Sequence, residues 1–163
     1  MNASKAQSPP VVRVTRVIRA PRERVFDAWV RPELRRQWWI AGGKPALTTC
    51  ELDARPGGRY CMKQRGGCTD EAPDFEWEME GQFVEVDRPR RLVFTWNVNH
   101  QPPVVDSRVT IDFNDVPGGT EIVLVHERLD TAALRDGTHD GWTHLIGHMA
   151  ELLEGRASAP GSA

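Results

Sequence analysis

A stripe of apolar residues with helical spacing lies near the end of this sequence and limits the folds that the chain can adopt. Between Asp136 and Glu154, apolar side chains recur at i, i+3, i+4, i+7, i+10 and i+11: Trp142, Leu145, Ile146, Met149, Leu152 and Leu153. This spacing places all six on one face of an α-helix. Thr138 or Asp140 can serve as its N-cap, and Gly155 as its C′ glycine. The sequence therefore predicts an amphipathic helix of about 15 to 18 residues, roughly 25 Å long.

Alternating apolar and polar residues before this helix predict a run of strands. In the clearest stretch, Phe75, Trp77, Met79, Gly81 and Phe83 alternate with three glutamates and a glutamine. Such alternation is typical of an antiparallel strand with one face in water, and Gly81 is a candidate for a bend or bulge. The other strands are expected at 11–20, 47–53, 59–64, 92–98, 105–113 and 122–126, and most of the turns between them are short.

Two short helices are expected between the first and second strands. Pro21 suits the first helical position, and Val25, Phe26 and Trp29 follow at helical spacing, so the first helix covers about 21–30. Pro32 can start a second helix, which carries Leu34, Trp38 and Trp39. Because neither helix is long enough to form a core alone, we expect the pair to close one end of the sheet.

The order of these elements predicts an α+β fold of one domain. A sheet of seven strands buries its apolar face against a single helix only if it curves around that helix. We therefore expect one domain over residues 11–154, in which the sheet curves around the long helix, with disordered tails at 1–10 and 155–163. The gap between the curved sheet and the helix is the default candidate for a ligand pocket.

Composition narrows the class of partner. The net charge of −2 gives no general attraction to nucleic acid or to anionic membranes. No apolar run approaches the roughly 20 residues of a membrane span, and the N-terminus lacks the apolar core of a secretory signal, so we expect a cytoplasmic protein. Cys50, Cys61 and Cys68 are odd in number and have no CxxC spacing, which favours free thiols over a disulfide or a zinc site.

Several stretches, taken in this order, resemble one known family. They are Ala20-Pro21 with Val25, Trp29 and Pro32-Glu33; Trp38-Trp39; Asp53 with Arg55-Pro56-Gly57-Gly58; Gly81 through Val86 with Pro89; Arg91 through Trp96; Arg108-Val109-Thr110; Gly119-Thr120 through His126; and Gly141-Trp142. The chain resembles the activator of heat-shock-protein-90 ATPase homology branch of the START, polyketide-cyclase and birch-pollen-allergen (SRPBCC) superfamily. The resemblance covers about 11–154 and implies the helix-grip fold, with a chaperone as one implied partner.

Large apolar side chains on the inward faces are the candidates for lining the cavity. The predicted ligand-binding residues are Trp39, Met62, Phe75, Trp77, Phe83, Trp96, His126, Trp142 and Met149, with Trp77, Trp96, Trp142 and Met149 at the centre. Tyr60 belongs to the same aromatic set. Taken singly, each of these residues is favoured to be plain core, and His126 to be a neutral, hydrogen-bonded core histidine. As a group they are what an apolar cavity in this fold would be lined with.

The sequence contains no pattern that specifies a catalytic or metal site. His144 and His148 have the i, i+4 spacing of a ligand pair but lack the glutamate of HExxH, and the alternation places Glu76, Glu78 and Glu80 on the outer face. Arg16 and Ser107 fall on inward faces, where an edge position or a satisfied structural role is favoured. We predict no catalytic residue, no metal and no cofactor.

Three functions follow as hypotheses. The preferred one is non-catalytic binding of a small hydrophobic or aromatic molecule between the sheet and the long helix. The first alternative is a cyclase- or aromatase-like enzyme that uses His126 or Arg16 in the same cavity. The second is a co-chaperone-like ATPase activator, as the resemblance implies. A homodimer through a strand edge is compatible with all three, and the sequence does not identify the ligand.

Overall fold

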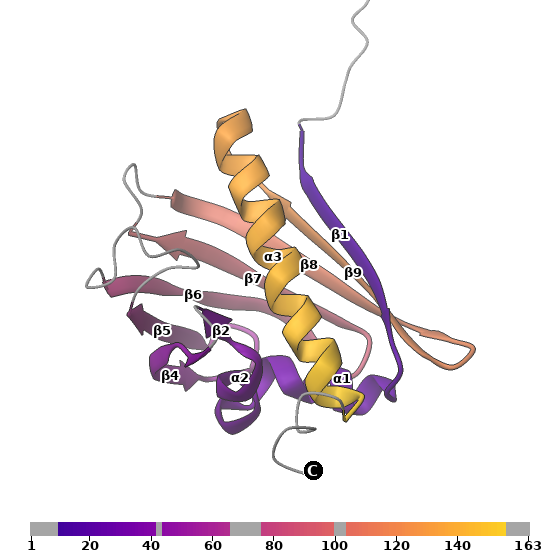
Figure 1. Ribbon diagram of the computed structural model, residues 1–163. Helices are drawn as coiled ribbons and strands as arrows, with labels where there is room; N and C mark the ends of the chain where they lie inside the picture. The colour runs from indigo at the N-terminus through magenta and orange to yellow at the C-terminus, as the bar shows by residue number, and fades with distance from the viewer. Residues whose placement is uncertain (1–9, 42–43, 66–75, 100–103, 156–163) are drawn as a thin grey trace, which may run out of the picture.

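The long C-terminal helix lies across one face of a seven-stranded antiparallel sheet, as Figure 1 shows. The computed structural model describes residues 10–41, 44–65, 76–99 and 104–155. The elements in chain order are β1 (Val12–Ile18), α1 (Arg22–Val30), α2 (Pro32–Trp38), β2 (Ile40–Ala41), β3 (Lys44–Pro45), β4 (Leu47–Leu52), β5 (Arg59–Arg65), β6 (Glu76–Asp87), β7 (Arg91–Val98), β8 (Val104–Val116), β9 (Gly119–Glu127) and α3 (Ala132–Leu153). The predicted fold class is confirmed.

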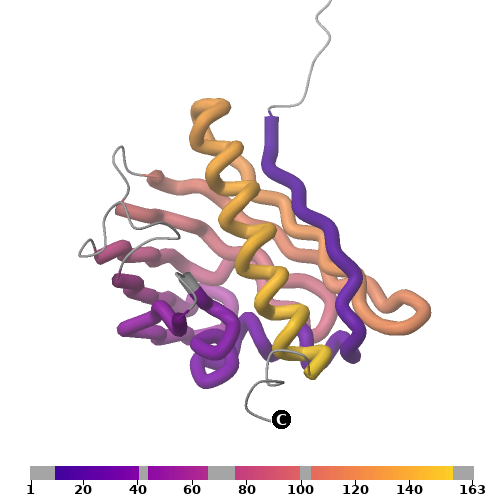
Figure 2. The backbone as a smooth tube through the Cα atoms, in the orientation of Figure 1, coloured from indigo at the N-terminus to yellow at the C-terminus, as the bar shows by residue number. Residues whose placement is uncertain are grey.

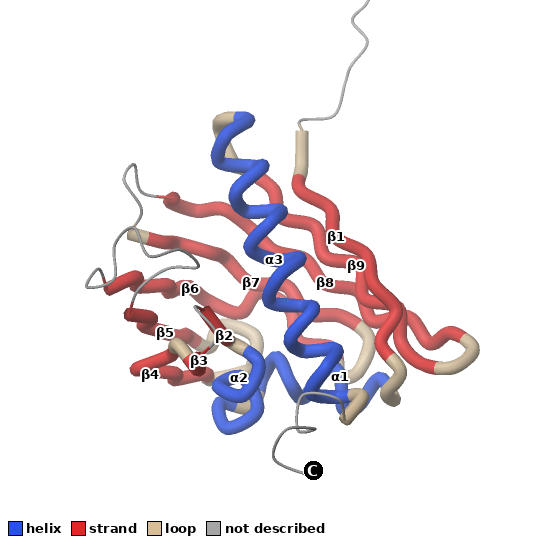
Figure 3. Tube along the Cα trace, viewed as in Figure 1, coloured by secondary structure: helices blue, strands red, loops and turns tan. Residues whose placement is uncertain are grey.

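The strand order in the sheet is β1-β9-β8-β7-β6-β5-β4. The first strand pairs with the last, with Val14 opposite Leu124, and the remaining strands follow as a meander. Figure 2 shows α3 crossing this sheet. The helices α1 and α2 pack against each other, and both contact α3. The expectation that the helix pair closes one end of the sheet agrees with this arrangement, which Figure 3 also displays by element type.

The apolar stripe of α3 is the part of the helix that enters the core. Trp142, Ile146, Met149 and Leu153 are buried, while Leu145 and Leu152 are half-buried at its flanks. Ala150 is buried as well, which brings the helix backbone close to its neighbours. The stripe predicted from spacing therefore faces the sheet.

The start of α3 corrects the prediction. The helix has 22 residues and begins at Ala132, and the side chain of Thr131 accepts a hydrogen bond from the Leu134 N–H at 3.1 Å as N-cap. Thr138 and Asp140, the predicted caps, lie inside the helix. Gly137 and Gly141 suggested a loop because glycine disfavours helices, but tertiary packing overrides that preference. At the other end, Gly155 has a φ of +83°, as expected for a C′ glycine.

Sheet irregularities lie near Gly81 but not at it. The pairing register of β6 and β7 shifts between Phe83 and Glu85, so the bulge follows Phe83 and does not lie at Gly81. Gly81 has another role, because a Cβ there would lie 2.3 Å from the Thr95 carbonyl oxygen. Glycine is therefore required for the close approach of β7 to β6. A small sheet, β2 with β3, was also not predicted.

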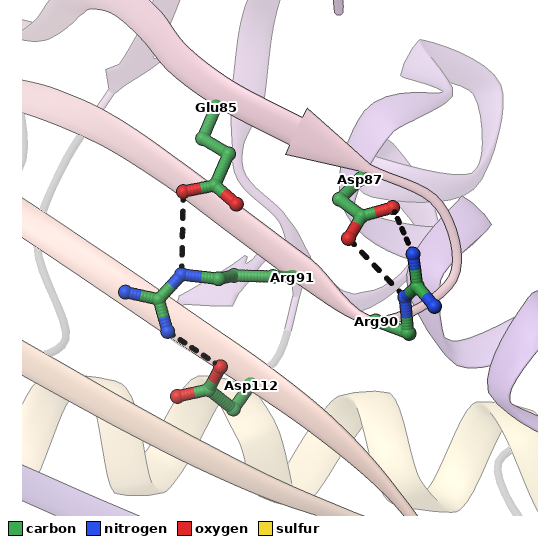
Figure 4. Close-up of polar contacts among 5 residues, drawn as sticks. All are labelled: Glu85, Asp87, Arg90, Arg91 and Asp112. Atoms are coloured by element: carbon green, nitrogen blue, oxygen red, sulfur yellow. Dashed lines mark hydrogen bonds and ion pairs between the residues drawn. The ribbon is translucent and has the colours of Figure 1, made fainter.

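Ion pairs cross the sheet near the β6–β7 turn, as Figure 4 shows. Arg91 on β7 reaches Glu85 on β6 at 3.3 Å and Asp112 on β8 at 2.8 Å, and Arg90 pairs with Asp87 within the turn. These side chains are substantially exposed, so each pair contributes at most about 1 kcal/mol. Their effect is to favour one register across three strands.

Some predictions fall outside the described residues: the tails at 1–9 and 156–163, the loops at 66–74 and 100–103, Cys68 and Phe75. Cys50 and Cys61 carry free thiols, as expected. None of the helices in the described part of the chain has the length and apolar character to cross a membrane.

The observed N-cap can be tested by a pair of matched substitutions. Thr131→Ala should lower the free energy of unfolding by about 1 kcal/mol, because it removes the acceptor for the Leu134 N–H. Thr138→Ala should change it by less than about 0.5 kcal/mol, since Thr138 lies in the helix interior, where alanine is favoured. Urea unfolding would measure both, and an equal cost at the two positions would contradict the helix start at Ala132.

Candidate functional site

A chain of hydrogen bonds runs through the apolar interior between the sheet and α3. Trp142 on α3 donates its indole N–H to Nδ1 of His126 on β9, with the nitrogens 3.0 Å apart. The other ring nitrogen of His126 lies 2.8 Å from Ser107 Oγ on β8, and Ser107 Oγ lies 2.6 Å from the Trp96 carbonyl oxygen on β7. The helix is thus connected to three neighbouring strands.

The donor-only character of indole assigns the proton on His126. Since the Trp142 N–H can only donate, Nδ1 of His126 must accept and its Nε2 carries the hydrogen. Nε2 then donates to Ser107 Oγ, and the Ser107 hydroxyl donates to the Trp96 carbonyl. Each polar atom of this Trp142–His126–Ser107–Trp96 series therefore has a partner. Burial lowers the pKa of His126 from 6.5 to about 3, so the ring stays neutral.

Five tryptophans form a continuous cluster around this chain. The tryptophan cluster comprises Trp29, Trp38, Trp39, Trp96 and Trp142, with the closest ring centroids 4.9 to 6.2 Å apart. Its members come from α1, α2, the residue after α2, β7 and α3. Ring pairs at such separations stabilise by about 0.5 to 1.5 kcal/mol beyond their buried area. The cluster therefore packs the helix pair, the sheet and α3 against one another.

A buried arginine lies against the same cluster. The side chain of Arg35 on α2 is 2% exposed, and its guanidinium carbon lies 5.1, 5.4 and 5.0 Å from the ring centroids of Trp29, Trp38 and Trp39. Its Nη1 donates to the Trp29 carbonyl oxygen. No carboxylate among the described residues pairs with it, and its Nε is buried without a partner. Burial lowers the pKa of Arg35 to about 10, which leaves it charged at neutral pH.

A cavity of about 390 Å³ lies between α3 and the sheet, next to the tryptophan cluster. The residues that line it are Trp39, Gln64, Trp77, Met79, Trp96, Val98, Ala133, Leu134, Gly137, Thr138, Gly141, Trp142 and Leu145. They belong to β5, β6, β7, the residue after α2 and the part of α3 between Ala133 and Leu145. None of these lining residues is charged. Gln64 accepts the Trp39 indole N–H at 2.8 Å, which orients one wall.

Two glycines on α3 provide space for this cavity. Gly137 and Gly141 are one helical turn apart, and a Cβ built on either meets no atom within 4 Å. Larger side chains at these positions would project into the cavity, because both residues line it. Gly137 and Gly141 made the start of α3 hard to predict from the sequence. In the structure their lack of side chains leaves space beside this part of the helix.

Of the nine predicted ligand-binding residues, the structure brings four to the cavity: Trp39, Trp77, Trp96 and Trp142. Met62, Phe83, His126 and Met149 are buried elsewhere in the core, and Phe75 lies outside the described residues. Tyr60 is also core, and its hydroxyl donates to the Thr95 carbonyl. Met149 was expected at the centre, but it lies beyond the cavity, in the second half of α3. Ligand contact by any of these residues stays a prediction.

Arg16 and Ser107 have the structural roles favoured from sequence. Arg16 is exposed on the edge strand β1, and Ser107 is bonded to His126 and Trp96. His144 and His148 bring their Nε2 atoms to 3.2 Å on the outer side of α3. The described residues contain no group of three or more metal-ligating side chains.

Sequence reasoning missed Gln64, Met79, Val98 and the residues from the first turns of α3. Met79 and Val98 carried a usable signal, because both share an inward face with predicted residues. Ala133, Leu134 and Thr138 did not, since the helix was expected to begin later. Arg35 also escaped notice, because an arginine on a short helix normally faces solvent.

Comparison with known proteins gives a family and a fold. A family described as Activator of Hsp90 ATPase homolog 1-like protein matches residues 19–154. A solved protein from Chromobacterium violaceum is 26% identical with a TM-score of 0.75, covering 90% of this chain and 99% of that one. A protein from Rhizobium leguminosarum is 24% identical with a TM-score of 0.74, covering 89% of this chain and 94% of that one. An AHSA1-like protein from Aeromonas hydrophila is 20% identical with a TM-score of 0.71, covering 91% of this chain and 94% of that one. Both share the fold. No curated protein matches the chain.

The buried histidine makes a specific contribution to the pH dependence of stability. His126 has a folded pKa of about 3 and an ordinary unfolded pKa of 6.5, so its stabilising effect is complete above pH 6.5 and is lost as the pH falls towards 3. Between pH 7 and pH 5 it should remove about 2 kcal/mol from the free energy of unfolding.

The control is His126→Gln, which keeps a polar side chain that does not titrate. Urea unfolding at pH 7 and pH 5 should show that the wild type loses about 2 kcal/mol more than this variant over that interval. Exposed carboxylates contribute equally to both proteins and cancel in the difference. An identical loss in the two proteins would mean that His126 is protonated normally in the fold.

Proposed function

The chain belongs to the Activator of Hsp90 ATPase homolog 1-like family, and from this premise we propose that it binds a small apolar or aromatic molecule in the cavity between α3 and β5–β7. The observation that carries the proposal is the character of the cavity walls. Four indole rings together with Met79, Val98, Leu134 and Leu145 line a partly open cavity of about 390 Å³. This volume lies within the range of about 300 to 1,000 Å³ that is typical of small-molecule sites.

The energetics favour a compact apolar ligand. A molecule that buries about 200 Å² of apolar surface in the cavity gains about 5 kcal/mol from that burial. Association costs of several kcal/mol oppose this gain, so additional ring stacking against the indoles is needed for tight binding. We therefore expect aromatic ligands to bind better than aliphatic ligands of equal size.

Binding without chemistry is the mode that the polar groups favour. General acid–base catalysis requires a titratable group within reach of the substrate. The residues that line the cavity include none, and both ring nitrogens of His126 are occupied by Trp142 and Ser107. These observations support binding over a cyclase- or aromatase-like reaction.

The proposed ligand-binding set is Trp39, Trp77, Trp96 and Trp142, extended by the lining residues that the sequence did not indicate. Met62, Phe83, His126 and Met149 are then supporting core residues. A chaperone partner, a cytoplasmic location and a homodimer stay predictions, since the cavity bears on none of them. Stimulation of a cognate chaperone ATPase would be the direct measurement for the first.

Filling the cavity from α3 tests the proposal. Gly141→Leu should fold, because a Cβ at this position meets open space and leucine favours the helix over glycine. Its side chain should occupy the cavity and weaken binding of the neutral fluorescent probe N-phenyl-1-naphthylamine at least about tenfold. Probe emission excited through the tryptophans would report the binding.

The matched control is Gly147→Leu. Gly147 lies on the same helix but outside the cavity, and a Cβ there meets only Arg16 Nη1, at 3.8 Å. This variant should bind the probe like the wild type. Equal affinity of the Gly141→Leu variant and the wild type would place the ligand elsewhere, and the absence of saturable binding in the wild type would remove the proposal.

A further inference from the structure

We propose that Arg35 makes the cavity select against cations, so that it takes neutral or anionic aromatic ligands and excludes quaternary ammonium ions. This inference rests on the proposed function and names the ligand class of the same site. It assigns to Arg35 a role in specificity, although the side chain is not among those that line the cavity.

The lining alone suggests the opposite preference. Indole faces attract cations through their negative quadrupoles, and cages of aromatic rings are used to bind quaternary ammonium groups. Four tryptophans around a cavity without charged lining residues meet that description. Whether these rings attract a cation therefore depends on the charged groups that contact them from outside the cavity.

A cation already lies behind one of them. The Arg35 guanidinium carbon is 5.0 Å from the ring centroid of Trp39, which also forms part of the cavity wall. The same guanidinium lies 5.1 and 5.4 Å from Trp29 and Trp38, one ring further from the cavity. The quadrupole of Trp39 thus already stabilises one positive charge, and a second cation at this ring would be repelled by the first.

The charge of Arg35 is not neutralised nearby. Its Nη1 donates to a carbonyl, its Nε has no partner, and the described residues place no carboxylate at ion-pair distance. The two titratable groups whose charges would be felt most strongly are Cys50 and Tyr60. Burial raises the pKa of both, so each is uncharged at neutral pH and offers no counter-charge.

The expected effect is large enough to measure. A ligand charge stacked on the cavity side of Trp39 would lie roughly 9 Å from the guanidinium. At an effective dielectric constant of about 20, repulsion between unit charges at that distance weakens binding on the order of twentyfold. An anion at the same place would gain by a similar factor, which offsets part of its loss of hydration.

The inference can be tested by comparing two ligands that have the same shape and differ only in charge. The neutral ligand is 4-neopentylphenol, and the cation is 4-hydroxybenzyltrimethylammonium, in which nitrogen replaces the quaternary carbon. Displacement of N-phenyl-1-naphthylamine would give both affinities. The wild type should bind the neutral ligand at least about tenfold more tightly, whereas an unopposed aromatic cage would favour the cation.

Substitution of Arg35 separates its charge from the general cost of dehydrating a cation. In Arg35→Met the ratio of the two affinities should fall at least about tenfold, because the repulsion is gone and the dehydration cost is unchanged. Arg36→Met is the matched control, since Arg36 is exposed on the same helix and solvent screens its charge. Arg35→Lys, which keeps the charge, should retain the wild-type ratio.

The outcomes are distinguishable. Tighter or equal binding of the cation by the wild type would overturn the inference even if the Arg35→Met variant failed to fold. An unchanged ratio in a folded Arg35→Met variant would also overturn it, while the proposed function would stand in both cases. Failure of the wild type to bind either ligand or the probe would contradict the proposed function and, with it, this inference.

Discussion

The hydrogen bond from Trp142 to His126 ties α3 to the sheet inside the core. It is a polar connection between α3 and the sheet in a region that is otherwise apolar, and the two nitrogens are 3.0 Å apart. Apolar packing alone lets a helix slide or rotate on a sheet at small cost, whereas a buried N–H that loses its acceptor costs about 1 to 3 kcal/mol. This bond therefore favours one position of α3, and the position of α3 determines the shape of the cavity.

Two buried basic groups are handled in contrasting ways. His126 is neutral, and both of its nitrogens have partners, so it contributes orientation without charge. Arg35 keeps its charge and has an unpartnered Nε, so it contributes a field without a neutralising ion. The tryptophan cluster lies between them and contacts both. The side chains that line the cavity are consequently neutral, but the positively charged Arg35 lies against the ring of Trp39 without lining the cavity itself.

The sequence predicted the architecture because its strongest signals are local. Alternation along β6 and helical spacing along α3 each report which side of one element is apolar, and burial of that side follows. Met79 and Trp142 could be placed on inward faces in this way. The first half of α3 could not, because Gly137 and Gly141 disfavour helix locally and only the packed structure compensates for them. The cavity lining was incompletely predicted for that reason.

The apolar patterns along the sequence were enough to predict a curved sheet packed around a long helix, with large aromatic residues facing the space between them. Which of these residues line the cavity and which fill the core became visible only in the packed structure. Met149 and Trp142 share one helical stripe, yet Met149 is enclosed and Trp142 borders the cavity. The physical reason is that periodicity gives the direction of a side chain, whereas enclosure depends on the residues that arrive from other strands and helices. The same holds for Arg35, because only the packed structure places its guanidinium carbon 5.0 Å from the ring of Trp39, a residue of the cavity wall.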